Sequence, residues 1–329
     1  MYIIFSNIDV DSICASSLYS RILNMIGNSK YRVVFCTQND LPDTFSNVTL
    51  GDNSRVVFIN LDIDNILDSI RSHINLKGIK VRVYNSRPIR HKVSDSISYI
   101  VITNMSVTNI IYVFFTNKFF NSFKYSKFDT FNQYLVSIAN VYKSIFNNIP
   151  IIHNIIYESI LLDYIINRYN RDTKIVDNIH NSLVNGIRVP DIQVISECIP
   201  IFNKLIEEIL DKIINNTRFS GKNINVYEYY SGNIYENRNI LLYIMNIITK
   251  KNKKINLLLL HTNTSSNIIV YKHPKIVYKI PEIALLLLEY FKDYEFCVKG
   301  KENFVVISFY NKIEINKLIK NISDINKYI

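Results

Sequence analysis

The chain has 329 residues, four cysteines and a formal net charge of +10 at pH 7, and this length allows two domains with substantial cores. The cysteines are scattered with no C-x-x-C pair, which excludes a readable zinc knuckle or disulfide framework and favours a reducing, intracellular compartment. The apolar stretches are far shorter than the ~20 residues that span a bilayer, and the N-terminus lacks a signal peptide, so we expect a soluble protein with no membrane partner.

The basic charge alone is weak evidence for nucleic-acid binding. Most of the excess is lysine, in a chain rich in Ile, Asn, Lys, Tyr and Phe, which share A/T-rich codons. Genome composition could therefore account for the charge.

Residues 1–103 alternate between strand and helix signals, the pattern of a largely parallel sheet with covering helices. The candidate strands are 3–5, 33–35, 56–59, 79–83 and 99–102. After the first strand, apolar residues recur at helical spacing from Ala15 to Met25, and Asp11 is placed to cap this helix. The sequence predicts a strand, a turn bearing acids and then a helix.

Residues 110–128 are crowded with aromatic residues and lysines of unclear period. Rings interleaved with Lys118, Lys124 and Lys127 could hold single-stranded nucleic acid by stacking and phosphate contacts. Aromatic side chains packed in a core or a partner interface are the commoner reason for such a run, and we give that interpretation more weight.

From residue 129 the pattern turns helical, and strand signals return after residue 223. We therefore predict an α/β protein in three parts: a parallel-sheet domain over 1–128, a helical interdomain region over 129–222, and a smaller C-terminal α/β domain over 223–329. The predicted C-terminal strands are 224–230, 255–260, 268–271, 295–298 and 304–309, and the helices are 237–250, 281–292 and 312–327.

Common catalytic and nucleotide-binding motifs are missing from the sequence. Neither G-x-x-x-x-G-K-[ST] nor G-x-G-x-x-G occurs, and there is no G-x-S-x-G elbow or H-E-x-x-H pair. Hydrolysis of ATP by a P-loop is excluded.

The run from Asn7 to Ser12 is the one arrangement that points to chemistry. Asp9 and Asp11 follow a strand, at the edge where α/β sheets bind ligands. Two-metal hydrolases need such acids, although an Asp before a helix commonly only caps it.

Residues 8–15, IDVDSICA, resemble the first motif of the cell division cycle 45 family, eukaryotic replication factors related to the RecJ-type DHH phosphoesterases. Those enzymes read H-x-D-x-D, so Asp9 and Asp11 match while Asn7 stands in place of the metal-binding His. The second motif, an Asp after the third strand, falls on Asn60, with Asp62 nearby but displaced.

The third motif, D-H-H in the enzymes and D-[ST]-H-R-P in the replication factors, aligns with residues 84–88. Tyr84, Asn85 and Ser86 replace its first three positions, and Arg87 and Pro88 match. Weaker resemblance covers almost the whole chain, at 157–163, 186–199, 218–248, 267–274 and 304–309. The chain is much shorter than typical members and carries no acidic loop of their kind.

The resemblance implies a DHH phosphoesterase-like fold with a DHH-associated C-terminal domain and a degenerate site. At most two carboxylates would remain, too few to position two metal ions, so we expect no metal, no cofactor and no catalysis. The implied function is a nuclear, non-catalytic subunit of the replicative DNA helicase that acts in initiation and elongation. Its implied partners are the MCM ring, the GINS complex, other replication-fork proteins and single-stranded DNA.

The alternative is a residual metal-dependent DHH-family phosphoesterase or exonuclease that recruits other ligands.

Two basic clusters are candidate DNA contacts. One lies beside the third motif and the other is a lysine run before a predicted strand: Arg87, Arg90, His91 and Lys92; Lys250, Lys251, Lys253 and Lys254. A lysine run between a helix and a strand is more often a solvated turn. For Arg87, a role in guiding a DNA strand and simple solvent exposure stay open.

Overall fold

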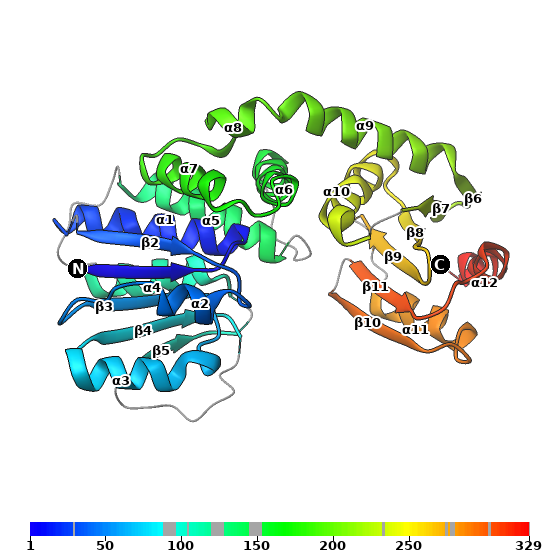
Figure 1. Cartoon of the computed structure of the whole chain (residues 1–329). Helices are drawn as coiled ribbons and strands as arrows, with labels where there is room; N and C mark the ends of the chain where they lie inside the picture. Colours follow the sequence, from blue (N-terminus) through cyan, green and yellow to red (C-terminus); the bar gives the residue numbers. More distant parts are fainter. Residues whose placement is uncertain are drawn as a thin grey trace. The chain divides into compact units, whose positions relative to one another are not determined.

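A computed structural model describes residues 1–28, 30–87, 97–103, 105–119, 128–144, 153–231, 234–273, 276, 280–301 and 304–328. The chain divides into two compact units, Met1–Lys143 with His153–Ile199, and Ser144–Ile152 with Pro200–Ile329 (Figure 1). Most of the helices that the sequence analysis set apart as an interdomain region therefore belong to the same unit as the first sheet.

The first unit is built on a parallel sheet whose described strands run in the order β2-β1-β3-β4-β5. These strands are β1 (Tyr2–Ser6), β2 (Tyr31–Phe35), β3 (Arg55–Ile59), β4 (Lys80–Asn85) and β5 (Ile97–Val101). Ser6 pairs with Phe35 on one side and with Ile59 on the other, so these strands end level at one edge. The predicted α/β class and the predicted parallel strands are confirmed.

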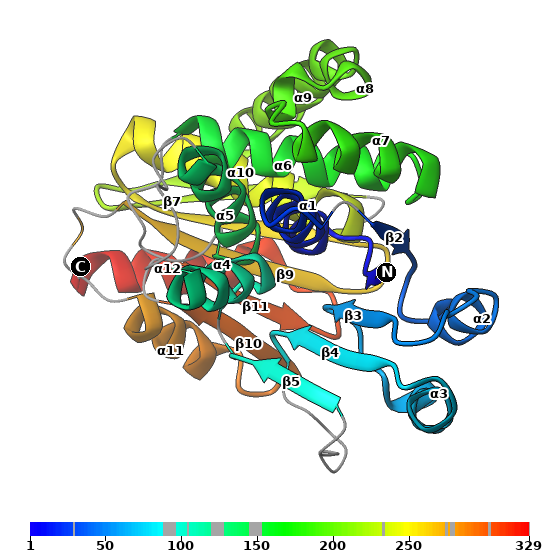
Figure 2. The same ribbon diagram turned by 90° about the vertical axis from the view of Figure 1, so that its left-hand side faces the viewer.

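Helices cover both faces of this sheet (Figure 2). On one face lie α1 (Val10–Met25) and α4 (Val107–Phe119), and on the other lie α2 (Leu41–Ser46), the short turn η1 (Asp64–Ile66) and α3 (Leu67–Lys77). The core under α2 includes the rings of Phe5 and Phe58, stacked with centroids 5.2 Å apart.

The aromatic segment that gave no clear period begins as helix α4. Phe115 is 7% exposed, and its ring meets that of Tyr19 in α1 at 5.4 Å. The Phe114 ring lies 6.1 Å from that of Tyr84 in β4. Core packing is thus confirmed for these two rings, whereas residues 120–127 lie outside the described residues.

Further helices complete the first unit through contacts with α1 and with one another. They are α5 (Phe128–Ser144), α6 (His153–Arg168), α7 (Thr173–Val184), η2 (Val189–Asp191) and α8 (Gln193–Ser196). The Arg21 guanidinium of α1 donates to the Val184 carbonyl at 2.7 Å, and the buried Glu158 of α6 accepts from Tyr134 at 2.5 Å and Arg188 at 2.9 Å. These bonds join helices that are distant in the sequence.

The second unit contains a mixed sheet whose described strands run β10-β11-β9-β8-β7-β6. The strands are β6 (Thr217–Ser220), β7 (Ile224–Tyr230), β8 (Ile255–His261), β9 (Ser266–Lys272), β10 (Phe296–Lys301) and β11 (Phe304–Phe309). The helices are α9 (Ile199–Asn215), α10 (Ile234–Asn252), α11 (Ile280–Tyr290) and α12 (Ile315–Tyr328). β7 and β8 are parallel and the other pairs antiparallel.

The described part of residues 223–329 contains both strands and helices, as the predicted α/β class requires, and β6 is a strand that the sequence did not predict. Searching the described residues finds no helix with the length and apolar character needed to cross a bilayer.

Candidate functional site

Asp9 forms the turn between β1 and α1. Its backbone is extended, with φ −146° and ψ 167°, and its Oδ1 accepts from the Ser12 backbone N–H at 2.7 Å. That geometry satisfies one of the free N–H groups in the first turn of α1. Asp9, rather than Asp11, therefore caps α1, and our expectation for Asp11 was wrong.

Two asparagine side chains converge on the same carboxylate. Asp9 Oδ2 accepts from Asn7 Nδ2 at 2.8 Å and from Asn60 Nδ2 at 2.9 Å. Because an ionised carboxylate only accepts hydrogen bonds, each amide must turn its nitrogen toward it. Asn60 follows β3 with φ +54°, a left-handed conformation that asparagine tolerates better than most residues. The first two motif positions thus meet at the carboxyl edge of the sheet, as a hydrogen-bonded cluster.

Asp11 lies one residue into α1, and its side chain is directed at a different helix. It is 3% exposed, and its carboxylate accepts from the backbone N–H of Val107 at 2.8 Å, the N–H of Thr108 at 3.0 Å and the Thr108 hydroxyl at 2.8 Å. Ser106 Oγ accepts from the next N–H, that of Asn109, at 3.1 Å. The first three N–H groups of α4 are therefore satisfied, two of them by Asp11, and the negative charge is favourable at this helix end.

The residues at the third motif position, Tyr84, Asn85 and Ser86, are buried or half-buried within the fold. Tyr84 is fully buried and faces the rings of Tyr19 and Phe114, and burial, partly offset by Arg82, raises its pKa to about 12. Asn85 accepts from the Arg87 backbone N–H at 3.0 Å, and Ser86 is half-buried. These side chains offer a phenol, an amide and a hydroxyl where the resemblance implies an acid and two imidazoles.

The side chains at the three motif positions do not fit the ligand set of the two-metal centre in the DHH enzymes. Both oxygens of Asp9 accept N–H bonds, and Asp11 is committed to α4. Asn60 Oδ1 is buried with no hydrogen-bond partner among the described residues, but it is a neutral oxygen. Within the described part of the chain, no three His, Cys, Asp or Glu side chains gather where a metal ion could be held. Two divalent ions would need bridging carboxylates and several further ligands.

Two residues that the sequence analysis did not select border this corner. Burial raises the pKa of the Tyr142 phenol in α5, and the carboxylates of Asp163, Asp9 and Asp11 raise it further. Burial likewise raises the pKa of the Cys14 thiol well above its usual value, and the negative charges of Asp11 and Asp9 raise it further. Asp163 of α6 therefore contributes negative charge to the same region as Asp9, and the sequence placed it only within a segment of weak resemblance.

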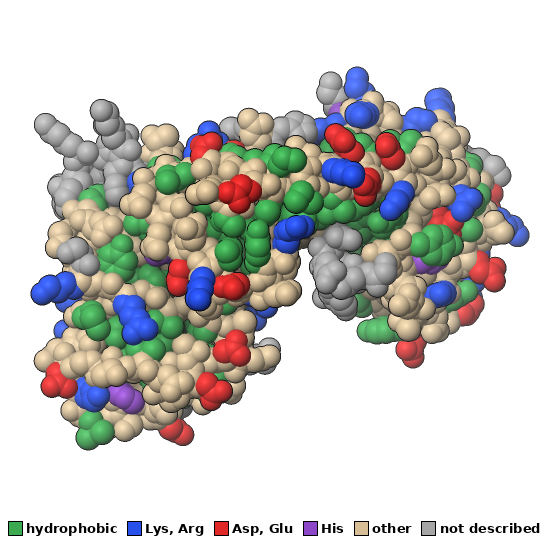
Figure 3. Space-filling view, turned by 45° about the horizontal axis from the view of Figure 1, so that its top comes forward, with side chains coloured by type: hydrophobic (Ala, Val, Ile, Leu, Met, Phe, Trp, Pro, Cys, Tyr) green, Lys and Arg blue, Asp and Glu red, His purple; other side chains and the backbone are tan. Residues whose placement is uncertain are grey.

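The candidate DNA contacts are placed only in part. Arg87 is exposed after β4, whereas Arg90, His91 and Lys92 lie outside the described residues. On the face that Figure 3 shows, the described Lys and Arg side chains are interspersed with Asp and Glu.

The lysine run begins in the last turn of α10, where cations suit the helix dipole. Lys250, Lys251 and Lys253 are exposed, and Lys253 ends the helix with φ +57°. Lys254 lies between α10 and β8 and donates to the Gly221 carbonyl at 2.7 Å, so its ammonium group joins this turn to the turn before β7.

A second polar cluster, in the other unit, resembles a hydrolytic triad only in its order of bonds. Ser266 Oγ lies 3.0 Å from His261 Nδ1, and His261 Nε2 lies 3.0 Å from Glu228. Ser266 is fully buried and accepts from the Ile313 N–H, while His261 and Glu228 are 5% and 2% exposed. A nucleophile must reach its substrate, so this cluster links β7, β8 and β9 as a structural element.

No known protein-family model matches the sequence, and no curated protein matches it. Among solved structures, the chain is similar to the DHH domain of a member of the S1p family of ribosomal proteins. The TM-score is 0.53 and the identity 11%, over 99% of this chain and 86% of that one. This likeness shows that the chain has the DHH-type fold.

Two other structures match with lower scores, which add nothing to the fold assignment. CDC45 from Entamoeba histolytica is 10% identical with a TM-score of 0.39, over 99% of this chain and 95% of that one. RecJ from Thermus thermophilus, in complex with Mn²⁺, is 8% identical with a TM-score of 0.44, over 99% of this chain and 51% of that one.

Proposed function

We propose that this chain is a non-catalytic DHH-fold protein that serves as a scaffold subunit of the eukaryotic replicative DNA helicase. The observation that carries the first half of the proposal is the pair of amides on Asp9. Asn7 and Asn60 donate hydrogen bonds to the carboxylate at positions where the resemblance implies a histidine and an acid that bind metal.

The energetics of this cluster favour hydrogen bonding over metal binding. A metal at Asp9 would have to displace N–H donors, and each partly buried donor left unpaired costs about 1–3 kcal/mol. The ion would gain one carboxylate and neutral oxygens in return, a weak set for Mg²⁺ or Mn²⁺. Loss of the metal removes the means of activating water, so the fold would act through its surfaces.

The helicase assignment rests on the motif resemblance to the cell division cycle 45 family, at Asp9 and Asp11 of the first motif and at Arg87 and Pro88 of the third. A subunit without a P-loop needs a separate motor, which the MCM ring would supply, and the GINS complex would complete the assembly. The proposed location is the nucleus, with roles in initiation and elongation. Single-stranded DNA is a proposed further partner, and the exposed Arg87 is a candidate contact.

Co-purification tests the assignment. The tagged full chain is expressed with GINS and MCM subunits from the same source, and both are expected to elute with it in fixed proportion through size exclusion. Asp9→Ala is the matched variant, because it removes the central carboxylate and should leave the complex intact. Failure of the folded wild-type chain to retain either GINS or MCM would contradict the proposal.

The second candidate is a residual metal-dependent phosphoesterase or exonuclease, which is favoured by the negative charge that Asp163 and Asp9 both bring to bear on the Tyr142 phenol. It is tested by incubating the chain with labelled single-stranded DNA and Mn²⁺. We expect no cleavage above background. Mn²⁺-dependent cleavage that disappears in both Asp9→Ala and Asp163→Asn would establish the enzyme and refute the non-catalytic proposal.

A further inference from the structure

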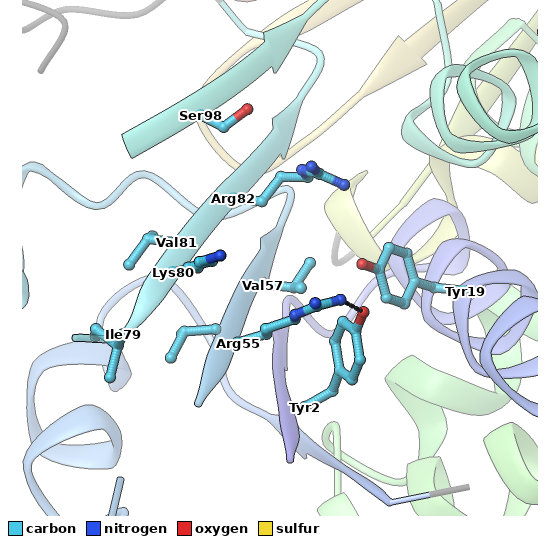
Figure 4. Close-up of a pocket in the computed structure, with 10 residues that line it drawn as sticks. Tyr2, Tyr19, Arg55, Val57, Ile79, Lys80, Val81, Arg82 and Ser98 are labelled. Atoms are coloured by element: carbon cyan, nitrogen blue, oxygen red, sulfur yellow. Dashed lines mark hydrogen bonds between the residues drawn. The ribbon is translucent and has the colours of Figure 1, made fainter. Parts of the chain in front are cut away.

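A pocket of about 610 Å³ opens at the end of the first sheet opposite the Asp9 cluster (Figure 4). It is lined by the starts of β1, β3, β4 and β5, together with Tyr19 of α1. Small-molecule sites commonly measure about 300–1,000 Å³, so the pocket has the size of a ligand site. No motif that we considered in the sequence lies there.

Among the described residues, three cations line this pocket and no acid does. Arg55 of β3 pairs in register with Lys80 of β4, and Arg82 follows Lys80 by two residues, so the three side chains share one face of adjacent strands. Like charges on neighbouring strands repel each other. Among the described residues, no ion pair involves any of the three. No acidic side chain in the described part of the chain pairs with these cations to offset the repulsion.

The described partners of the two arginines are neutral. Arg55 donates to the Tyr2 hydroxyl, as the dashed line in Figure 4 shows, and its guanidinium lies 5.2 Å from the centre of the Tyr2 ring. Arg82 donates to the Tyr84 hydroxyl at 3.4 Å and lies 5.2 Å from the centre of the Phe114 ring. Arg82 Nε is buried and has no hydrogen-bond partner in the part of the chain that the structure describes. A buried donor on a cation is costly unless an anion satisfies it.

We propose that this pocket binds a small phosphate-bearing molecule about the size of a mononucleotide. A guanidinium presents a planar set of donors that matches phosphate oxygens, and Arg82 Nε has no acceptor among the described residues. A dianionic phosphate would also relieve the repulsion between Arg55 and Lys80. The Tyr2 and Tyr19 rings, with Val57, give the rest of the ligand an apolar wall. The proposal does not depend on the helicase assignment.

Isothermal titration calorimetry on the full chain, at low and at moderate salt, tests this site. The probes are adenosine 5′-monophosphate, inorganic phosphate and a dT20 oligonucleotide. We expect one saturable site for the monophosphate, with inorganic phosphate binding more weakly because it lacks contacts to the apolar wall. Lys80→Gln and Arg82→Gln should each weaken binding of the monophosphate about tenfold, a loss of ~1.4 kcal/mol.

The control is Arg32→Gln, which removes an exposed arginine of β2 in the same sheet and should leave the affinity unchanged. Arg82 also packs against Phe114, whereas Lys80 is exposed, so Lys80→Gln still decides the matter if Arg82→Gln fails to fold. Absence of saturable binding by the phosphate probes would overturn the proposal, as would equal affinities in wild type and Lys80→Gln. Binding of the oligonucleotide alone, weakened in Lys80→Gln, would make the pocket a nucleic-acid contact and would also overturn it.

Discussion

Asp11→Ala is expected to lower the free energy of unfolding by about 4 kcal/mol, because it leaves several buried donors without an acceptor. The carboxylate accepts the N–H groups of Val107 and Thr108 and the Thr108 hydroxyl, at a position that is 3% exposed. Water cannot replace these bonds without entering the contact between α1 and α4. Urea denaturation followed by circular dichroism measures the change.

The matched variants are Asp9→Ala and Thr108→Val. Asp9 is only half-buried, so water can reach the donors that Asp9→Ala leaves without an acceptor, and the loss of the helix cap and of the two amide bonds should cost about 2 kcal/mol. Thr108→Val removes one donor and keeps the shape of the side chain, so a loss of about 1 kcal/mol is expected. A larger loss for Asp9→Ala than for Asp11→Ala would show that the assignment of the two caps is wrong.

Asp11→Ala also distinguishes a helix-capping role for this carboxylate from a role as a metal ligand. Acids gathered to bind metal repel one another in the metal-free protein, and their removal commonly raises stability. Asp11 instead satisfies a helix end, so its removal should destabilise the chain both with and without Mn²⁺. Stabilisation of metal-free Asp11→Ala would indicate a metal ligand.

His180, in the contact between α7 and α1, is expected to make the free energy of unfolding depend strongly on pH. His180 is 4% exposed, lies 3.3 Å from Ser20 Oγ, and meets the Phe35 ring edge-on. Burial lowers its pKa from 6.5 to about 4, so the folded protein holds the neutral imidazole. The unfolded chain therefore binds an extra proton between these two values. The contribution of neutral His180 to the free energy of unfolding is complete above pH 6.5. About 3 kcal/mol of it is lost as the pH falls toward 4.

Carboxylates also titrate in this range, so the informative quantity is the difference between wild type and His180→Gln. Their unfolding free energies are expected to converge as the pH falls from 6.5 to 4. His73→Gln, at a less buried histidine in α3, serves as the control and should keep the wild-type pH profile. Parallel curves for wild type and His180→Gln would contradict the assigned role.

The sheets were predictable because their strands are short, nearly continuous apolar runs, as expected when both faces of a sheet are covered. The sequence could not show that Asp9 caps α1 while Asp11 accepts from the first turn of α4. Asp9 and Asp11 are both acids near a helix start, and the bond from Asp11 to Val107 spans 96 residues, which local spacing cannot report. Ser106, three residues before Asn109, was a usable signal for the start of α4.

The Asp9 cluster could be predicted in its positions but not in its bonds. Parallel strands with level ends bring Asn7 and Asn60 to one edge of the sheet, and the motif alignment selected both. The sequence does not show that the two amides face Asp9. That arrangement depends on the left-handed backbone at Asn60 and on the carboxylate oxygens of Asp9, which accept the amide N–H groups. Tyr142 and Asp163 come from separate helices, and no spacing in the sequence relates them to Asp9.

The most direct test of the central claim is anomalous diffraction from crystals soaked in Mn²⁺. Crystals of Asn7→His/Asn60→Asp, which restores an imidazole and a second carboxylate, are soaked in parallel for comparison. Since hydrogen-bond donors occupy both oxygens of Asp9 in the natural sequence, we expect no fully occupied manganese peak there in wild-type crystals. Two fully occupied manganese ions at Asp9 and Asp11 in the wild-type protein would contradict the account.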